Sequence, residues 1–192
     1  MKWVLSLGFL GLLFAGRALA ENRQRVYETY PQTASALPLQ RTRANFAEGR
    51  DLLFAVDGNP RSFTTAMVYL RSAAARHYAP AQTLMGLIYA EGYGVPKDHS
   101  KARAWYRLAA QQGYARAQIN LGDMDAKERG VSSNLVGAYT WYASAKASSR
   151  LGSLAYRDAT GRIANISSRM TPAQLATAQR LIADRRASER SK

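Results

Sequence analysis

Two apolar stripes with helical spacing lie close together in the middle of the chain. Their members are Ala81, Met85 and Ile88 in the first stripe and Ala102, Trp105 and Ala109 in the second. Each set occupies one face of an α-helix. Residues 92–96 (GYGVP) separate the stripes and form a turn, because Gly accepts positive φ and Pro cannot continue a helix. The pattern predicts a hairpin of a first helix (helix A), a glycine turn and a second helix (helix B).

The same pattern recurs 36 residues later in the chain. Ten residues of segment 81–114 are identical at that spacing: Ala81, Gln82, Gly86, Ala90, Gly94, Val95, Ala102, Trp105, Tyr106 and Ala109. A weaker copy precedes them, in which Tyr69 takes the place of Trp105. Favourable N-cap residues also share one register, at Ser62, Asp98 and Asn134. Such a period indicates a solenoid, because one hairpin cannot bury both of its faces and must stack on the next.

The pattern AQxxxG…GxGVxxDxxKAxxWYxxAAxQG of residues 81–114 resembles the Sel1-like repeat, an α-solenoid relative of the tetratricopeptide repeat. The resemblance covers residues 44–150 and is strongest in the middle copy. It implies an all-α fold, an α-solenoid superhelix of antiparallel helix-turn-helix repeats, with about three repeats and C-terminal capping helices. It also implies scaffolding or protein binding rather than catalysis.

The segments outside the repeats have different compositions. Residues 1–20 combine a basic start, an apolar run and a small-x-small end, which predicts a signal peptide cut after Ala20; an uncleaved anchor is the alternative. Residues 21–43 contain two prolines and predict an extended N-terminal arm, either a disordered spacer or a docking segment. Residues 151–192 break the period and predict capping helices with a basic tail. Within them, Thr171-Pro172-Ala173-Gln174 has the form of a capping box.

The charge and the cysteine count limit the compartment and the partners. The chain has no cysteine, which excludes disulfides and thiolate metal sites, and its formal charge is +14, or +12 once Lys2 and Arg17 are removed with the signal peptide. We expect a Gram-negative periplasmic protein without a membrane span in the mature chain; secretion is the alternative. The excess charge either aids solubility or attracts an acidic protein, peptidoglycan or another anionic envelope polymer. Export argues against nucleic acid.

Catalytic and metal-binding patterns are scarce in the sequence. His77 and His99 are the only histidines and are far apart in the repeat register. No Ser-x-x-Lys nucleophile motif occurs. Asp123 and Asp125 point apart on a helix and are expected to solvate the surface. We therefore expect no enzyme, no metal and no cofactor, and we expect Trp105 and Trp141 to be core residues.

A polar stripe on the last predicted helix A is the candidate binding surface. It contains Arg116, Asn120, Asp123 and Lys127, on a different face from the apolar stripe. In tetratricopeptide relatives helix A lines a concave groove, so the resemblance implies a peptide site formed by Arg116, Asn120, Asp123 and, from the preceding repeat, Thr83 and Leu87. An ordinary solvent-exposed face is the alternative.

Two classes of function fit these features. The first is a non-enzymatic periplasmic scaffold or adaptor that binds a protein, peptide or envelope component through the concave surface. The second is a cell-wall-associated hydrolase, which is supported only by the predicted compartment and the positive charge of the chain. An accessory subunit of an envelope machine, such as a flagellar motor ring, is a third possibility that the sequence does not separate from the first.

Overall fold

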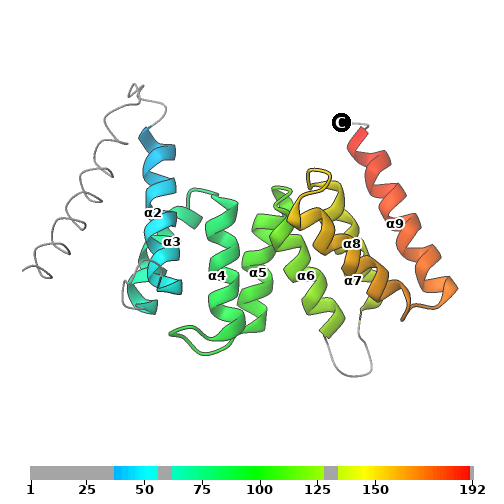
Figure 1. Cartoon of the computed structure of the whole chain (residues 1–192), viewed down its shortest axis with the longest axis horizontal. Coiled ribbons are helices and arrows are strands. Elements are labelled where there is room, and N and C mark those ends of the chain that lie inside the picture. Colours follow the sequence, from blue (N-terminus) through cyan, green and yellow to red (C-terminus); the bar gives the residue numbers. More distant parts are fainter. Residues whose placement is uncertain (1–36, 56–61, 128–133, 191–192) are drawn as a thin grey trace, which may run out of the picture. The chain divides into compact units, whose positions relative to one another are not determined.

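The fold consists of consecutive α-helices, seen in a computed structural model that describes residues 37–55, 62–127 and 134–190 (Figure 1). The helices are α2 (Leu37–Phe54), α3 (Phe63–Ala74), α4 (Ala79–Glu91), α5 (His99–Gln111), α6 (Ala115–Lys127), α7 (Leu135–Ala147), α8 (Leu154–Ser167) and α9 (Pro172–Arg190). No strand occurs in these ranges, so the all-α prediction is confirmed. The predicted signal peptide 1–20 and residues 21–36 of the predicted N-terminal arm lie outside the described residues.

The chain divides into two compact units, residues 1–41 and 42–192, and every contact below lies within the second. Helices α4 and α5 form one hairpin, and α6 and α7 form the next. Consecutive hairpins stack through contacts of α3 with α4 and of α5 with α6, and α8 packs on α7. Helix α9 turns back onto α7. This nearest-neighbour packing is that of a helical solenoid.

A glycine on helix A meets a large side chain on helix B in each hairpin. A Cβ atom at Gly86 would lie 2.5 Å from the Tyr106 ring, and one at Gly122 would lie 2.7 Å from Cδ1 of Tyr142. Both distances are too short for a real Cβ. The first hairpin repeats the contact, since a Cβ at Gly49 would lie 2.7 Å from Leu70 Cγ. The helix pairs therefore approach so closely that only glycine fits beneath the facing side chain.

The aromatic core differs in detail from the prediction. Tyr106 and Tyr142 are each 3% exposed, whereas Trp105 and Trp141 are only half-buried. Trp105 packs against the core that contains Leu70 of the preceding repeat and Met85 of its own helix A. The tyrosines thus fill the inside of each hairpin, and the tryptophans cover the junctions between hairpins.

The predicted helix starts are confirmed at three of four caps. Asp98 accepts from Lys101 N at 2.8 Å, and Asn134 accepts from Gly137 N at 2.8 Å. Thr171 and Gln174 form the reciprocal capping box. Ser62 precedes α3 but caps no backbone N–H; its hydroxyl bonds the Thr65 hydroxyl instead.

Two predictions about the ends of the repeat region need correction. Helix α2 begins at Leu37, so residues 37–43 are helical rather than part of an extended arm. The chain tolerates this because a proline at position 38 lies in the first helical turn, where its missing N–H has no helical partner. The predicted capping helices would bury apolar residues at the start of this segment, yet Leu151 and Leu154 are 78% and 77% exposed, because α9 packs on α7 and leaves the start of α8 uncovered.

The glycine contacts predict a large difference between two chemically identical substitutions. Gly86→Ala places a methyl group into the Tyr106 ring and should lower the free energy of unfolding by about 1–3 kcal/mol. Gly161→Ala on α8 is the matched control, because nothing lies within 4 Å of its added Cβ. That control should keep or raise stability, because alanine favours helix over glycine. Denaturant unfolding measures both; equal effects would contradict the close approach.

Burial of the hairpin tyrosines predicts a loss of stability at high pH. Burial, helped by the charges of Glu91 and Asp123, raises the pKa of Tyr106 above its ordinary value of 10.0. The unfolded chain therefore loses the phenolic proton first, so this contribution is complete below pH 10 and is lost as the pH rises above it. Unfolding curves from about pH 8 to pH 12 should show Tyr106→Phe losing less stability than the wild type over this range. Parallel curves would contradict the burial argument.

Candidate binding cleft

A cleft of about 420 Å³ opens where α4, α5 and α6 meet. It is lined by Leu87, Ala90, Glu91, His99, Tyr106, Asn120, Asp123, Met124 and Lys127. Three of the five predicted binding residues, Leu87, Asn120 and Asp123, are among them. The glycine contact of the middle hairpin positions this cleft, since Tyr106 is both the ring over Gly86 and part of the cleft wall.

The cleft combines an apolar surface with polar groups. Leu87, Ala90 and Met124 provide aliphatic contact area. The Asn120 side chain hydrogen-bonds the Tyr106 phenol, which opposes the rise that burial causes in the Tyr106 pKa. Because an amide offers two donor hydrogens and a carbonyl acceptor, Asn120 retains hydrogen-bonding capacity for a ligand. Glu91 and Lys127 add charges of opposite sign. Such a surface suits a mixed polypeptide segment better than a uniformly charged polymer.

Two predicted binding residues do not line the cleft. Thr83 is 5% exposed, and its hydroxyl donates to the Ala79 carbonyl at 2.9 Å within α4. It lies on the buried side of the helix, so the structure corrects its placement on the groove. Arg116 is exposed, and its Nη1 lies 3.8 Å from Asp158 Oδ2 on α8. It therefore faces α8 rather than the cleft.

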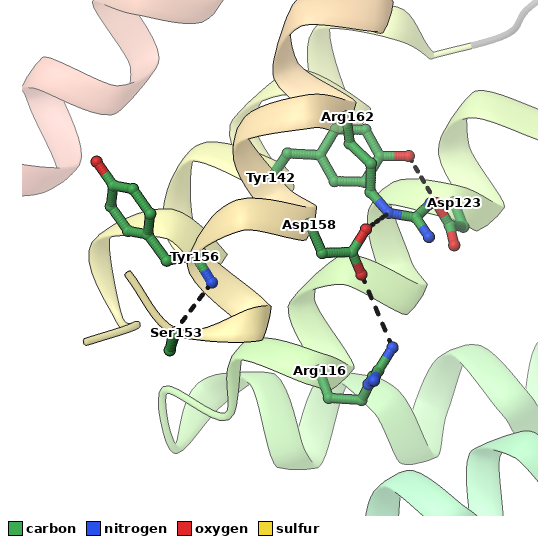
Figure 2. A network of polar contacts seen from close by, with 7 residues as sticks. All are labelled: Arg116, Asp123, Tyr142, Ser153, Tyr156, Asp158 and Arg162. Carbon is green, nitrogen blue, oxygen red and sulfur yellow. Dashed lines mark hydrogen bonds and ion pairs between the residues drawn. The ribbon is translucent and has the colours of Figure 1, made fainter. Parts of the chain in front are cut away.

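Asp123 belongs to a polar network that joins three helices, as Figure 2 shows. The Tyr142 hydroxyl donates to Asp123 Oδ1 at 2.8 Å, and Arg162 pairs with the same carboxylate. Arg162 also donates from Nε to Asp158 Oδ1 at 2.8 Å. The network continues to Arg116 and so links α6, α7 and α8. Asp123 is thus a cleft residue whose carboxylate is already engaged by the chain.

The neighbouring carboxylate, Asp125, also differs from its predicted solvent-exposed role. Asp125 is 4% exposed, and Arg103 on α5 donates to its Oδ1 at 2.5 Å. The two aspartates point apart, as predicted, but each points into an ion pair with another helix. Asp125 consequently ties the two hairpins together on one side of α6, while Asp123 ties α6 to α8 on the other.

Six cleft residues are absent from the predicted binding site: Ala90, Glu91, His99, Tyr106, Met124 and Lys127. His99 follows the α5 cap, so its position beside the cleft depends on how the glycine turn folds. The 36-residue identity marks Tyr106 as a repeated residue, which agrees with its buried ring but says nothing of its hydroxyl. The one available signal was the repeat register, which places helix A of one repeat beside helix B of the preceding repeat.

The described residues give no indication of metal or membrane chemistry. They hold no group of three or more His, Cys, Asp or Glu side chains placed to bind a metal. His77 lies at the end of α3 with a φ of 57°, in the register of Gly113, whose φ is 77°. It thus serves a helix-ending turn. None of the described helices has the length and apolarity of a membrane span.

The α6–α8 network predicts that two of the predicted site residues contribute unequally to the free energy of unfolding. Asp123→Ala removes bonds to Tyr142 and Arg162 and should cost about 1–3 kcal/mol of unfolding free energy. Arg116→Ala removes one exposed, long ion pair and should change stability by less than about 0.5 kcal/mol. Thermal unfolding of the two variants measures the difference. An equal cost would show that the α6–α8 network does not operate in solution.

Comparison with known proteins places these hairpins in a family. The Sel1 repeat matches residues 79–114 and 115–149, which are the α4–α5 and α6–α7 hairpins with their flanking turns. No protein of curated function matches the sequence. The α2–α3 hairpin lies outside the matched ranges, although it has the same glycine contact at Gly49.

Several solved structures are similar to the chain. A protective antigen present in uropathogenic Escherichia coli strains, which displays an SLR fold, is 28% identical with a TM-score of 0.63; the match covers 73% of this chain but only 29% of that protein. A Sel1 repeat protein from Oxalobacter formigenes is 32% identical with a TM-score of 0.53, and the match covers 69% of this chain and 94% of that one. The chain therefore belongs to the Sel1 repeat family of α-solenoid proteins.

Proposed function

We propose that the chain is a non-enzymatic adaptor that binds a segment of another protein in the cleft between α4, α5 and α6. Sel1 repeat proteins generally mediate protein–protein interaction, and the family is typically non-catalytic. The observation that carries the proposal is the cleft itself, where Leu87 and Met124 lie beside the Asn120 amide. Aliphatic surface provides affinity for apolar side chains, and an amide can pair with the backbone of an extended segment.

Charge adds to this proposal at longer range. After loss of residues 1–20 the formal charge is +12, so an acidic partner would be attracted before contact. Within the cleft, Lys127 offers a cation to the bound segment, whereas Asp123 is paired with Arg162 and Glu91 Oε2 lies 3.9 Å from Lys97 Nζ. An acidic segment with a few apolar residues therefore fits best. A cleft of this size makes a modest interface, so we expect transient binding that weakens as salt rises.

The proposed location is the periplasm of a Gram-negative bacterium. The support is the sequence of residues 1–20, with Lys2 before an apolar run and Ala18-Leu19-Ala20 at its end. The lack of cysteine is compatible with an oxidising compartment. Envelope proteins are accordingly the first source in which to seek the partner.

A pair of matched substitutions tests the cleft. Leu87→Asp puts a charge into the cleft wall, and Leu108→Asp puts the same charge on an exposed leucine of α5 that lines none of the described clefts. With the chain lacking residues 1–20 as bait, quantitative recovery of partners from an envelope extract should fall about tenfold or more for Leu87→Asp. Leu108→Asp should recover the same partners as the wild type.

Two further results define the outcome of this experiment. Asn120→Ala should weaken recovery. Because it also removes the hydrogen bond to the Tyr106 phenol, its melting temperature is compared with that of Tyr106→Phe, which removes the same bond but keeps the amide for the ligand. Equal recovery by the wild type, Leu87→Asp and Asn120→Ala would rule out the cleft as the binding site. Recovery that did not fall with increasing salt would remove the electrostatic part of the proposal.

A further inference from the structure

A buried glutamine near the start of helix A is fully hydrogen-bonded in the middle repeat. Gln82 is 2% exposed, and its Nε2 donates to the Ala74 carbonyl at 3.3 Å. Its Oε1 accepts from Nε2 of Gln112 at 2.7 Å. The amide therefore joins the end of the preceding helix B to the end of its own helix B, and both of its ends are paired.

The next repeat keeps the glutamine but loses the second partner. Gln118 is 5% exposed, and its Nε2 donates to the Ala110 carbonyl at 3.2 Å. This bond fixes the orientation of the amide, because a carbonyl can only accept. The position equivalent to Gln112 is Ser148, whose side chain is too short to replace it. As a result, no described group donates to Gln118 Oε1, which is a buried acceptor. Such a group is costly unless a donor reaches it.

A cleft of about 400 Å³ lies beside this acceptor, between the ends of α5 and α7 and the middle of α9. Gln118, Trp141, Ser144, Ser148, Ile182 and Arg185 line it. The guanidinium of Arg185 lies 5.7 Å from the centre of the Trp141 ring and donates from Nη1 to the Ser144 hydroxyl at 3.1 Å. These contacts hold the cation in place. No carboxylate of a described residue forms an ion pair with it, in contrast to Arg162 of the α6–α8 network.

The chemistry of the cleft specifies its ligand. Gln118 Oε1 lacks a hydrogen-bond donor, the exposed Arg185 guanidinium can pair with an anion, and Trp141 with Ile182 offers apolar surface. A free carboxyl end of a peptide carries these three features on one residue: an amide N–H, an α-carboxylate and a side chain. We propose that this cleft binds the C-terminal residue of a peptide, with the carboxylate on Arg185 and the last amide N–H on Gln118. This site is separate from the α4–α6 cleft and does not depend on the adaptor proposal.

Three short peptides test the assignment against the full chain. The probes are acetyl-Ala-Leu-Leu with a free carboxylate, the same peptide as its C-terminal amide, and the same peptide with its last amide nitrogen methylated. Isothermal titration should show saturable binding of the free acid. Both altered peptides should bind about tenfold or more weakly, as expected for loss of one charge-assisted or one buried hydrogen bond. Absence of binding by the free acid, or equal affinity for all three probes, would overturn the proposal.

Variants of the chain distinguish recognition from a change of folding. Ser148→Gln restores the residue found in the middle repeat, so its amide should donate to Gln118 Oε1, raise the melting temperature and abolish peptide binding. Arg185→Gln should remove the preference for the free acid over the amide. Gln112→Ser is the matched control in the middle repeat and should lower stability while leaving binding unchanged. Peptide binding by Ser148→Gln at wild-type strength would overturn the assignment of Gln118.

Discussion

The close approach of a helix A glycine to a helix B side chain is the constraint on which the rest of the structure depends. Gly86 lies beneath Tyr106 and Gly122 beneath Tyr142, with no room for a methyl group. Since each ring covers one specific glycine, the contact fixes both the separation of the two helices and their register along the axis. The same contact between Gly49 and Leu70 shows that the first hairpin follows the same rule with an aliphatic side chain.

This contact also places the functional surface. Tyr106 is held over Gly86, so its hydroxyl reaches the cleft beside Asn120. Tyr142 is held over Gly122, so its hydroxyl reaches Asp123 and the pair with Arg162. The repeat thus places one tyrosine hydroxyl beside Asn120 and the equivalent hydroxyl of the next repeat beside Asp123. Where the sequence departs from the repeat, a polar group is left unpaired. Ser148 occupies the position of Gln112, and no described group donates a hydrogen bond to Gln118 Oε1.

The fold could be predicted from the sequence because its determinants are local and repeated. Helix ends are specified by the turn glycines and by the caps at Asp98 and Asn134. The 36-residue period specifies that successive hairpins stack. The site was predicted only in part. Leu87 and Asn120 line the cleft, but Thr83 is buried because a rotation of one residue moves a helical position from the surface to the core. The partners of Asp123 and Asp125 lie on other helices, and α8 is outside the repeat, so no periodicity could reveal them.

A double-mutant cycle between Gly86 and Tyr106 tests the central constraint most directly. Gly86→Ala should destabilise the wild type, because the new methyl group enters the Tyr106 ring. In the Tyr106→Ala background the ring is gone, so the same substitution should cost nothing or add a little helix propensity. The account predicts a coupling of about 1–3 kcal/mol in denaturant unfolding at one temperature. Additive effects of the two substitutions would contradict it.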